Sequence, residues 1–176
     1  YNRHLRDNPG GLVSAGVEVA RLFLEEGSTI VKQEGRADGT AGRQVVTFDA
    51  PATSLPLMVL VNGRTASASE IVAGALHDNC RAALVGSRTY GKGLIQSVYE
   101  LADASGVVLT VGKYVTPSGV DIDATGITPD VSDALGRKRP GFGEARRALR
   151  ACEAVPRVAR ADLPEGQPRG GADAGQ

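Results

Sequence analysis

The longest uninterrupted apolar run of this chain is only five residues long, Leu57 to Val61. A run this short cannot cross a membrane, and its lack of polar alternation predicts a strand that is buried on both faces. A second apolar segment, residues 82–85, predicts another buried strand, and residues 67–78 between them predict a helix. Strand, helix and strand in this order predict an α/β fold.

The remaining segments predict further helices and an antiparallel hairpin. Val13, Val17 and Ala20 recur at helical spacing, which predicts a helix over residues 12–26 that stops at Gly27. Apolar and polar residues alternate over residues 95–101 and 107–115, on either side of a turn at 103–106, which predicts the hairpin. Two β segments are expected over residues 28–32 and 43–49, around a Gly-rich connection at 35–42, and a weakly amphipathic helix over residues 143–153.

Composition excludes several classes of partner. The 20 Lys and Arg residues balance 20 Asp and Glu residues, and aromatic residues make up only 4% of the chain, with no Trp. A role in binding nucleic acid or a membrane surface through bulk charge is therefore not expected, nor is base stacking on single-stranded nucleic acid. The two cysteines, Cys80 and Cys152, are far apart and form no CxxC pair, so we expect no disulfide framework, no metal site and no cofactor.

The neutral total charge conceals two regions. Residues 133–176 hold nine basic and six acidic side chains together with 11 glycines and prolines. Apolar periodicity stops after about Cys152, and low apolar content of this kind is typical of disorder. We therefore expect one domain over residues 1–132 and a basic tail over residues 133–176, with one weak helix followed by a disordered end.

Ser67 lies where the strand of residues 57–61 turns into the following helix. A hydroxyl at this position would lie near free backbone N–H groups, which favour an oxyanion and so suit a nucleophile. The alternative is that Ser67 and Ser69 only cap the helix. A histidine base is hard to supply, because His77 follows ten residues later, about 15 Å away at helical rise, and His4 has no clear partner to orient it.

Lys92 is the alternative base. Gly91 and Gly93 flank it in a loop, and they allow close approach to a neighbouring site. Desolvation there would lower the pKa of the lysine and let it accept the serine proton. Two other interpretations remain: a solvated surface lysine, or a phosphate-binding loop, although the Ser or Thr that follows the lysine of a P-loop is missing.

Several segments, in order, closely resemble the signature segments of the C-terminal processing peptidases, also called tail-specific proteases. The resemblance covers residues 5–131, and its segments are Leu5-Arg6-Asp7-Asn8-Pro9-Gly10-Gly11, Asn62-Gly63-Arg64-Thr65-Ala66-Ser67-Ala68-Ser69-Glu70-Ile71, Ala75-Leu76-His77-Asp78-Asn79, Tyr90-Gly91-Lys92-Gly93-Leu94-Ile95-Gln96, Tyr114-Val115-Thr116-Pro117-Ser118-Gly119 and Gly126-Ile127-Thr128-Pro129-Asp130.

The resemblance implies a serine endopeptidase of the crotonase-like, Clp-like β-spiral fold, with a Ser/Lys dyad that cuts near the C-terminus of its substrates. Ser67 falls on the family nucleophile and Lys92 on the general base, and Gln96 falls on a residue that orients the lysine in some members. Glu70 and Asp78 match acidic positions tied to activity, although Glu70 also suits a helix dipole and Asp78 a pair with Arg81. The implied oxyanion donors are the backbone N–H groups of Ala68 and of Gly10 or Gly11.

Within the family, the residues at positions 75–79, 93–98 and 122–127 look most like those of the plant and algal plastid enzymes. Those mature a photosystem II reaction-centre precursor in the thylakoid lumen, whereas bacterial relatives are periplasmic. Members capture the substrate's C-terminal region with an upstream PDZ domain, which this chain lacks together with any targeting segment, so we expect a partial catalytic domain. Two alternatives remain: a remnant that only binds protein, and a crotonase-like acyl-CoA enzyme, whose chemistry would not need Ser67 and Lys92.

Overall fold

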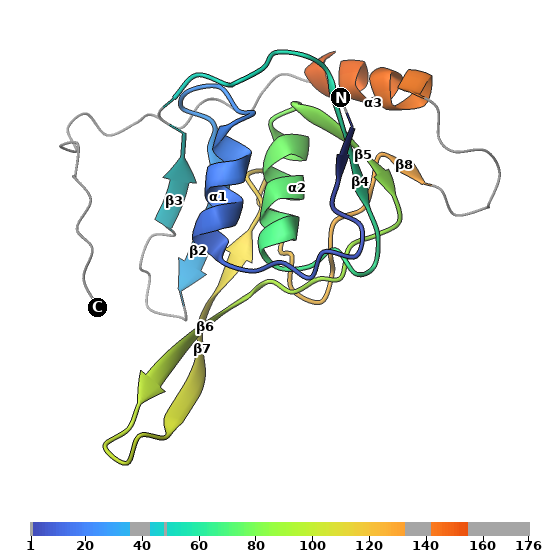
Figure 1. Cartoon of the computed structure of the whole chain (residues 1–176). Coiled ribbons are helices and arrows are strands. Elements are labelled where there is room, and N and C mark those ends of the chain that lie inside the picture. The colour runs from blue at the N-terminus through green and yellow to red at the C-terminus, as the bar shows by residue number, and fades with distance from the viewer. Residues whose placement is uncertain (1, 36–42, 48, 133–141, 155–176) are drawn as a thin grey trace.

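The computed structural model describes residues 2–35, 43–47, 49–132 and 142–154. They form two four-stranded sheets and three helices (Figure 1), which confirms the predicted α/β fold. The parallel sheet has the order β1-β4-β5-β8, with β1 at Asn2–His4, β4 at Leu57–Val61, β5 at Ala82–Gly86 and β8 at Val131–Ser132. The antiparallel sheet has the order β3-β2-β7-β6, with β3 at Arg43–Val46, β2 at Thr29–Gly35, β7 at Gly106–Val115 and β6 at Leu94–Glu100.

Helices cover both faces of the parallel sheet. Helix α1 (Val13–Arg21) and helix α2 (Ala68–Asp78) pack together between the two sheets, and helix α3 (Phe142–Ala154) lies against β5 and β8 on the other side (Figure 1). In β4, Val59 faces the main core and Met58 faces α3, as the alternation of a strand requires. The prediction of a strand buried on both faces is therefore confirmed.

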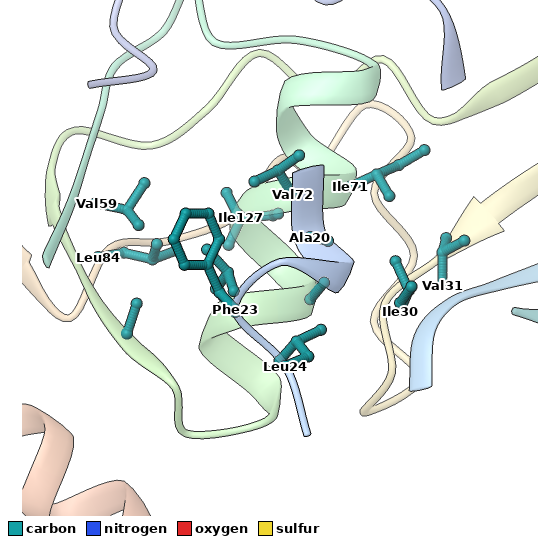
Figure 2. Packing of buried hydrophobic residues seen from close by; sticks show 14 of the residues in the cluster. Ala20, Phe23, Leu24, Ile30, Val31, Val59, Ile71, Val72, Leu84 and Ile127 are labelled. Atoms are coloured by element: carbon teal, nitrogen blue, oxygen red, sulfur yellow. The ribbon is translucent and has the colours of Figure 1, made fainter. Parts of the chain in front are cut away.

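The main core joins α1 and α2 to the inner faces of both sheets. Figure 2 shows Phe23 beside Leu84 of β5, and Ile71 of α2 on the side of the core that holds Ile30 and Val31 of β2. The predicted helix of residues 12–26 is too long at its C-terminal end, since α1 stops at Arg21. Phe23 and Leu24 continue in tight turns, bonded to carbonyls three residues back, which keep both side chains in the core.

The prediction that the two distant cysteines form no disulfide framework is wrong. Cys80, two residues beyond the end of α2, and Cys152 in α3 form a disulfide with a Cα–Cα distance of 5.5 Å, although 72 residues separate them. A long separation in sequence does not prevent two cysteines from forming a disulfide. The packing of α3 on the parallel sheet sets the distance between these two thiols and brings them within bonding range. The helix predicted over residues 143–153 is thus present. Apolar packing on the parallel sheet and the disulfide hold it in place. Most of the expected connection at 35–42, the expected domain boundary at 132–133 and the expected disorder of residues 160–176 fall on or beside residues outside those described.

The predicted hairpin is formed by β6 and β7 and projects from the body of the molecule (Figure 1). The apolar side chains of its outer part are exposed, with Val98 73% and Val108 56% accessible, whereas Tyr114 and Val115 at the base of β7 are buried. In the part of the chain that the structure describes, no helix is long and apolar enough to cross a membrane.

Candidate active site

Ser67 is the N-cap residue of α2 and has a strained backbone. Its φ of 55° and ψ of −123° lie in a region that residues other than glycine rarely adopt, at a cost of about 1–3 kcal/mol. The preceding turn is held by the Thr65 side chain, which accepts a hydrogen bond from Asn62 N and donates one to Leu5 O at 2.8 Å. Strain held in place by surrounding bonds is a feature of functional positions.

Glu70, in the first turn of α2, joins the Ser67 turn to the Lys92 loop. Its side chain is fully buried, and each carboxylate oxygen accepts two hydrogen bonds. Oε2 accepts from Ser67 N at 2.9 Å and from Lys92 N at 2.8 Å. Oε1 accepts from Thr89 Oγ1 at 2.6 Å and from Gly91 N at 2.7 Å. One oxygen atom thus connects the backbones of the two residues predicted to form the dyad.

The Lys92 loop is shaped by its glycines. A Cβ on Gly93 would lie 2.4 Å from Asp123 N, and Gly91 has a φ of 88° and packs against Gly126. The close approach predicted for these glycines is real, but it is made to residues 123–126. The Gly91 and Lys92 N–H groups already hold the Glu70 carboxylate, which leaves them unavailable for a phosphate and argues against the phosphate-loop alternative.

A cavity of about 570 Å³ opens beside this loop. Lys92 and Gln96 both line it, and both side chains are exposed, with no hydrogen bond between them in the described part of the chain. The remaining lining residues are Asp7, Pro9, Arg64, Ala66, Tyr90, Gly91, Leu94 and Asp123. The structure therefore brings Gln96 to the same cavity as Lys92 without showing it orient the lysine.

Of the predicted oxyanion donors, Gly10 and Ala68 lie together at the start of α2. Gly10 has a φ of 97° and packs so closely that a Cβ there would lie 3.0 Å from Ala68 N. Its own N–H donates to Asn8 Oδ1 at 3.0 Å, whereas the Gly11 and Ala68 N–H groups make no hydrogen bond within the described residues. Of the two predicted glycines, Gly11 is therefore the one with an available donor.

Asp78 lies at the opposite end of α2 from Ser67 and does not line the cavity. Its side chain is 8% exposed and binds His77 Nδ1 at 2.8 Å and Ser118 N at 2.9 Å. The suggested pair with Arg81 is wrong, because Arg81 donates instead to backbone carbonyls of Phe23 and Thr53.

His77 lies between two carboxylates at this far end of α2. Nε2 is 3.2 Å from Asp130 Oδ1, and Nδ1 contacts Asp78. The hydrogen bonds to Asp130 and then to Asp78 raise the pKa of His77 to about 10 against the opposing effect of burial. His77 is therefore a protonated structural group that links α2 to the loop before β8.

Sequence reasoning missed Thr89 and Asn62. Thr89 meets Glu70 across 19 residues, and Asn62 binds Asp7 across 55 residues, with Asn62 Nδ2 2.8 Å from Asp7 Oδ1. Bonds from Asn62 and then Arg64 hold the pKa of Asp7 below its usual value. No local signal in the sequence marks these two pairs. Each residue suits the turn or helix in which it lies, and only the fold brings the partners together.

Comparison with known protein families shows which family this chain resembles. Residues 5–133 match the model of peptidase family S41. The chain belongs to this family. Membership of a peptidase family favours the peptidase interpretation over the acyl-CoA alternative.

The most informative relatives are plastid and cyanobacterial proteins. The chain is 59% identical over 148 residues to the chloroplastic carboxyl-terminal-processing peptidase 1 of Arabidopsis thaliana, covering 84% of this chain and 29% of that protein. It is 56% identical over 130 residues to a carboxyl-terminal-processing protease of Synechocystis, covering 74% of this chain and 30% of the relative. A solved photosystem II D1 C-terminal processing protease matches with a TM-score of 0.69 and 46% identity, covering 74% of this chain and 33% of that one. The chain thus spans about 30% of the length of these curated relatives.

Proposed function

We propose that this chain carries the catalytic dyad of a serine endopeptidase that cleaves protein substrates near their C-terminus. The observation that carries the proposal is the Glu70 carboxylate, one oxygen of which binds both Ser67 N and Lys92 N. The backbone nitrogens of Ser67 and Lys92 can therefore be no further apart than the sum of these two hydrogen-bond lengths, 2.9 Å and 2.8 Å. This proximity, beside a cavity that Lys92 lines, supports a nucleophile and a base that act together.

In the proposed mechanism, Ser67 Oγ attacks the scissile carbonyl carbon while neutral Lys92 accepts the hydroxyl proton. The negative oxygen of the tetrahedral intermediate receives hydrogen bonds from the Ala68 and Gly11 N–H groups, each contributing about 3–4 kcal/mol. The lysinium then protonates the leaving amine, and an acyl-enzyme remains on Ser67. Water attacks this ester as Lys92 takes its proton. The lysinium then returns the proton to Ser67 Oγ as the acyl C–O bond breaks, which releases the new C-terminus and restores the free serine. Gln96 helps to orient Lys92, and Asp78 acts at a distance by holding the far end of α2.

The relatives guide the choice of substrate and location. As the substrate we propose a C-terminal extension of a photosystem II reaction-centre precursor, because the solved relative is a photosystem II D1 C-terminal processing protease. We expect the substrate to be bound by its C-terminal region. Chloroplastic and cyanobacterial relatives support a plastid location. Within the plastid we propose the thylakoid lumen, with the bacterial periplasm as the alternative.

The test is covalent labelling with a fluorophosphonate probe, combined with hydrolysis of a peptide that copies a D1 precursor C-terminus. We expect the adduct on Ser67, no labelling of Ser67→Ala and at least 100-fold slower labelling of Lys92→Ala. Ser69→Ala, which alters the neighbouring serine of the same helix, serves as the control and should still be labelled. Labelling that persists in Ser67→Ala would overturn the assignment.

A further inference from the structure

Thr89 is a buried hydroxyl residue that neither the resemblance nor the comparisons single out. It precedes the Lys92 loop and is only 5% exposed. Its Oγ1 donates to Glu70 Oε1 at 2.6 Å and accepts a hydrogen bond from Ile127 N at 2.7 Å. The single proton of the hydroxyl is therefore directed to the carboxylate that joins Ser67 to Lys92.

We propose that Thr89 is a positioning residue of the active site, whose hydroxyl fixes the rotation of the Glu70 carboxylate and thereby the spacing of Ser67 and Lys92. The inference rests on the proposed function for its catalytic consequence. The contact itself is independent of that function.

The rotation of the Glu70 carboxylate depends on bonds to both of its oxygens. Oε2 is held by the two dyad residues themselves, so only Oε1 anchors the group to something else. The Oε1 partners are Thr89 Oγ1 and Gly91 N, and Gly91 belongs to the Lys92 loop. Among the described residues, Thr89 is thus the single Glu70 partner that lies outside both the Ser67 turn and the Gly-Lys-Gly segment. A buried carboxylate that loses one of four donors becomes free to turn toward the remaining three.

The hydroxyl of Thr89 is anchored in turn by the segment before β8. Ile127 N donates to it, and Gly126 packs so closely that a Cβ there would lie 2.4 Å from Thr89 O. Gly126 also has a φ of 65°, which favours glycine. The contact chain therefore runs from Ile127 through Thr89 and Glu70 to the backbones of Ser67 and Lys92.

The backbone around Thr89 is held without its hydroxyl. Thr89 N donates to Ile127 O at 3.1 Å, and Tyr90 N donates to Thr65 O at 2.9 Å. A Thr89→Val variant would therefore keep the course of the loop and lose mainly the hydroxyl bonds. Thr89→Ser keeps the hydroxyl and loses a methyl group.

The experiment compares Thr89→Val and Thr89→Ser with a matched control, Thr47→Val. Thr47 is 1% exposed and its hydroxyl donates to the Glu25 carbonyl, away from Glu70 and the cavity. Peptide hydrolysis gives kcat and KM, and amide hydrogen exchange by NMR reports on the Ser67, Gly91 and Lys92 N–H groups. We expect Thr89→Val to lower kcat about tenfold with KM unchanged and to speed exchange at these amides by a similar factor, because the hydrogen bond that reaches Glu70 is lost together with the one from Ile127 N. Thr89→Ser should restore both quantities, and Thr47→Val should change neither.

The inference would be overturned by exchange at Ser67 and Lys92 that is unchanged in Thr89→Val, or by an equal fall in kcat in Thr47→Val. If the unaltered chain shows no Ser67-dependent hydrolysis, the proposed function fails, and the exchange measurement still decides whether Thr89 orients Glu70. Faster exchange that Thr89→Ser does not restore would also count against the hydroxyl.

Discussion

At the scale of single residues, the candidate site depends on backbone positions that only certain side chains tolerate. Gly10 illustrates this, because it packs against Ser67 and Ala68 with a φ of 97°. Its lack of a side chain lets the turn before α1 approach the start of α2, where the proposed nucleophile and oxyanion donors lie. Glu70 has the complementary role, since its charge is buried only because four donors surround it.

Gly10→Ala should disrupt this approach. The new Cβ would lie 2.7 Å from Ala66 O and 2.8 Å from Ser67 Cβ, on a backbone that alanine rarely adopts. We expect a loss of about 1–3 kcal/mol in the free energy of unfolding and at least tenfold slower labelling of Ser67. Urea denaturation and probe kinetics measure the two effects. Gly63→Ala is the control, because its nearest neighbour would be Arg88 O at 3.8 Å, and equal effects in both variants would contradict the prediction.

His77 should make stability depend on pH. Its pKa is about 10 in the folded chain and about 6.5 when unfolded, so its contribution is complete below pH 6.5 and is lost as pH rises toward 10. We expect the thermal midpoint to fall over this range by at least about 2–4 °C more than in His77→Gln, which corresponds to about 1 kcal/mol. His4→Gln, which changes the exposed histidine of β1, should keep the full pH dependence. A His77→Gln curve that parallels the unaltered chain would refute this.

At the scale of secondary-structure elements, α3 completes the outer layer of the parallel sheet. Ala145 and Leu149 pack on Met58, Ala83 and Val85, and the bond from Cys80 to Cys152 holds the helix to the region beyond α2. Cys80 itself has a φ of 53°, at a helix end where glycine is usual. The small apolar contact and the disulfide therefore act together in docking α3.

Cys152→Ser should loosen this layer. Removing a bridge between residues 72 positions apart is expected to cost about 2–5 kcal/mol, mainly because the unfolded chain gains freedom. Urea denaturation under non-reducing conditions measures the loss. The unaltered chain with a phosphine reductant should match the variant, and a variant as stable as the oxidised chain would contradict a structural role for the bridge.

At the scale of the whole molecule, the β6–β7 hairpin is an apolar projection from a well-packed body. Val98 and Val108 face each other across the hairpin and are both largely exposed, and Tyr99 and Leu109 are half exposed on the same strands. Exposed apolar surface of this kind promotes association between molecules.

The double variant Val98→Thr and Val108→Thr should reduce self-association. Threonine keeps the β-branched shape that suits a strand and adds a polar group, so the thermal midpoint should change by less than about 2 °C. Sedimentation velocity at increasing concentration measures the association. A matched pair in the core, Val59→Thr and Val61→Thr, should instead lower the midpoint strongly, and unchanged association in the hairpin variant would contradict the prediction.

Much of the architecture follows from local pattern. The run Leu57–Val61 predicts β4 with its exact bounds, because five consecutive apolar residues suit a strand covered on both faces. Helix α2 follows from the small residues that begin it, and the hairpin follows from its alternation of apolar and polar residues. The end of α1 does not follow from local pattern, because Phe23 and Leu24 continue the helical spacing of apolar residues although their backbone leaves the helix. Only the shape of the core distinguishes a longer helix from the observed turns.

The sequence by itself determines which residues this chain offers for chemistry: a serine at a strand-to-helix turn, a lysine between glycines, and motifs of the S41 peptidases. Only the tertiary structure decides how they are connected. In the folded chain, the Gly10 N–H donates to Asn8 and Asp78 binds His77. Cys80 forms a disulfide with Cys152, and Thr89 donates a hydrogen bond to Glu70. The physical reason is that a hydrogen bond or a disulfide depends on a distance of a few ångströms, and chain folding sets that distance between residues that are far apart in sequence.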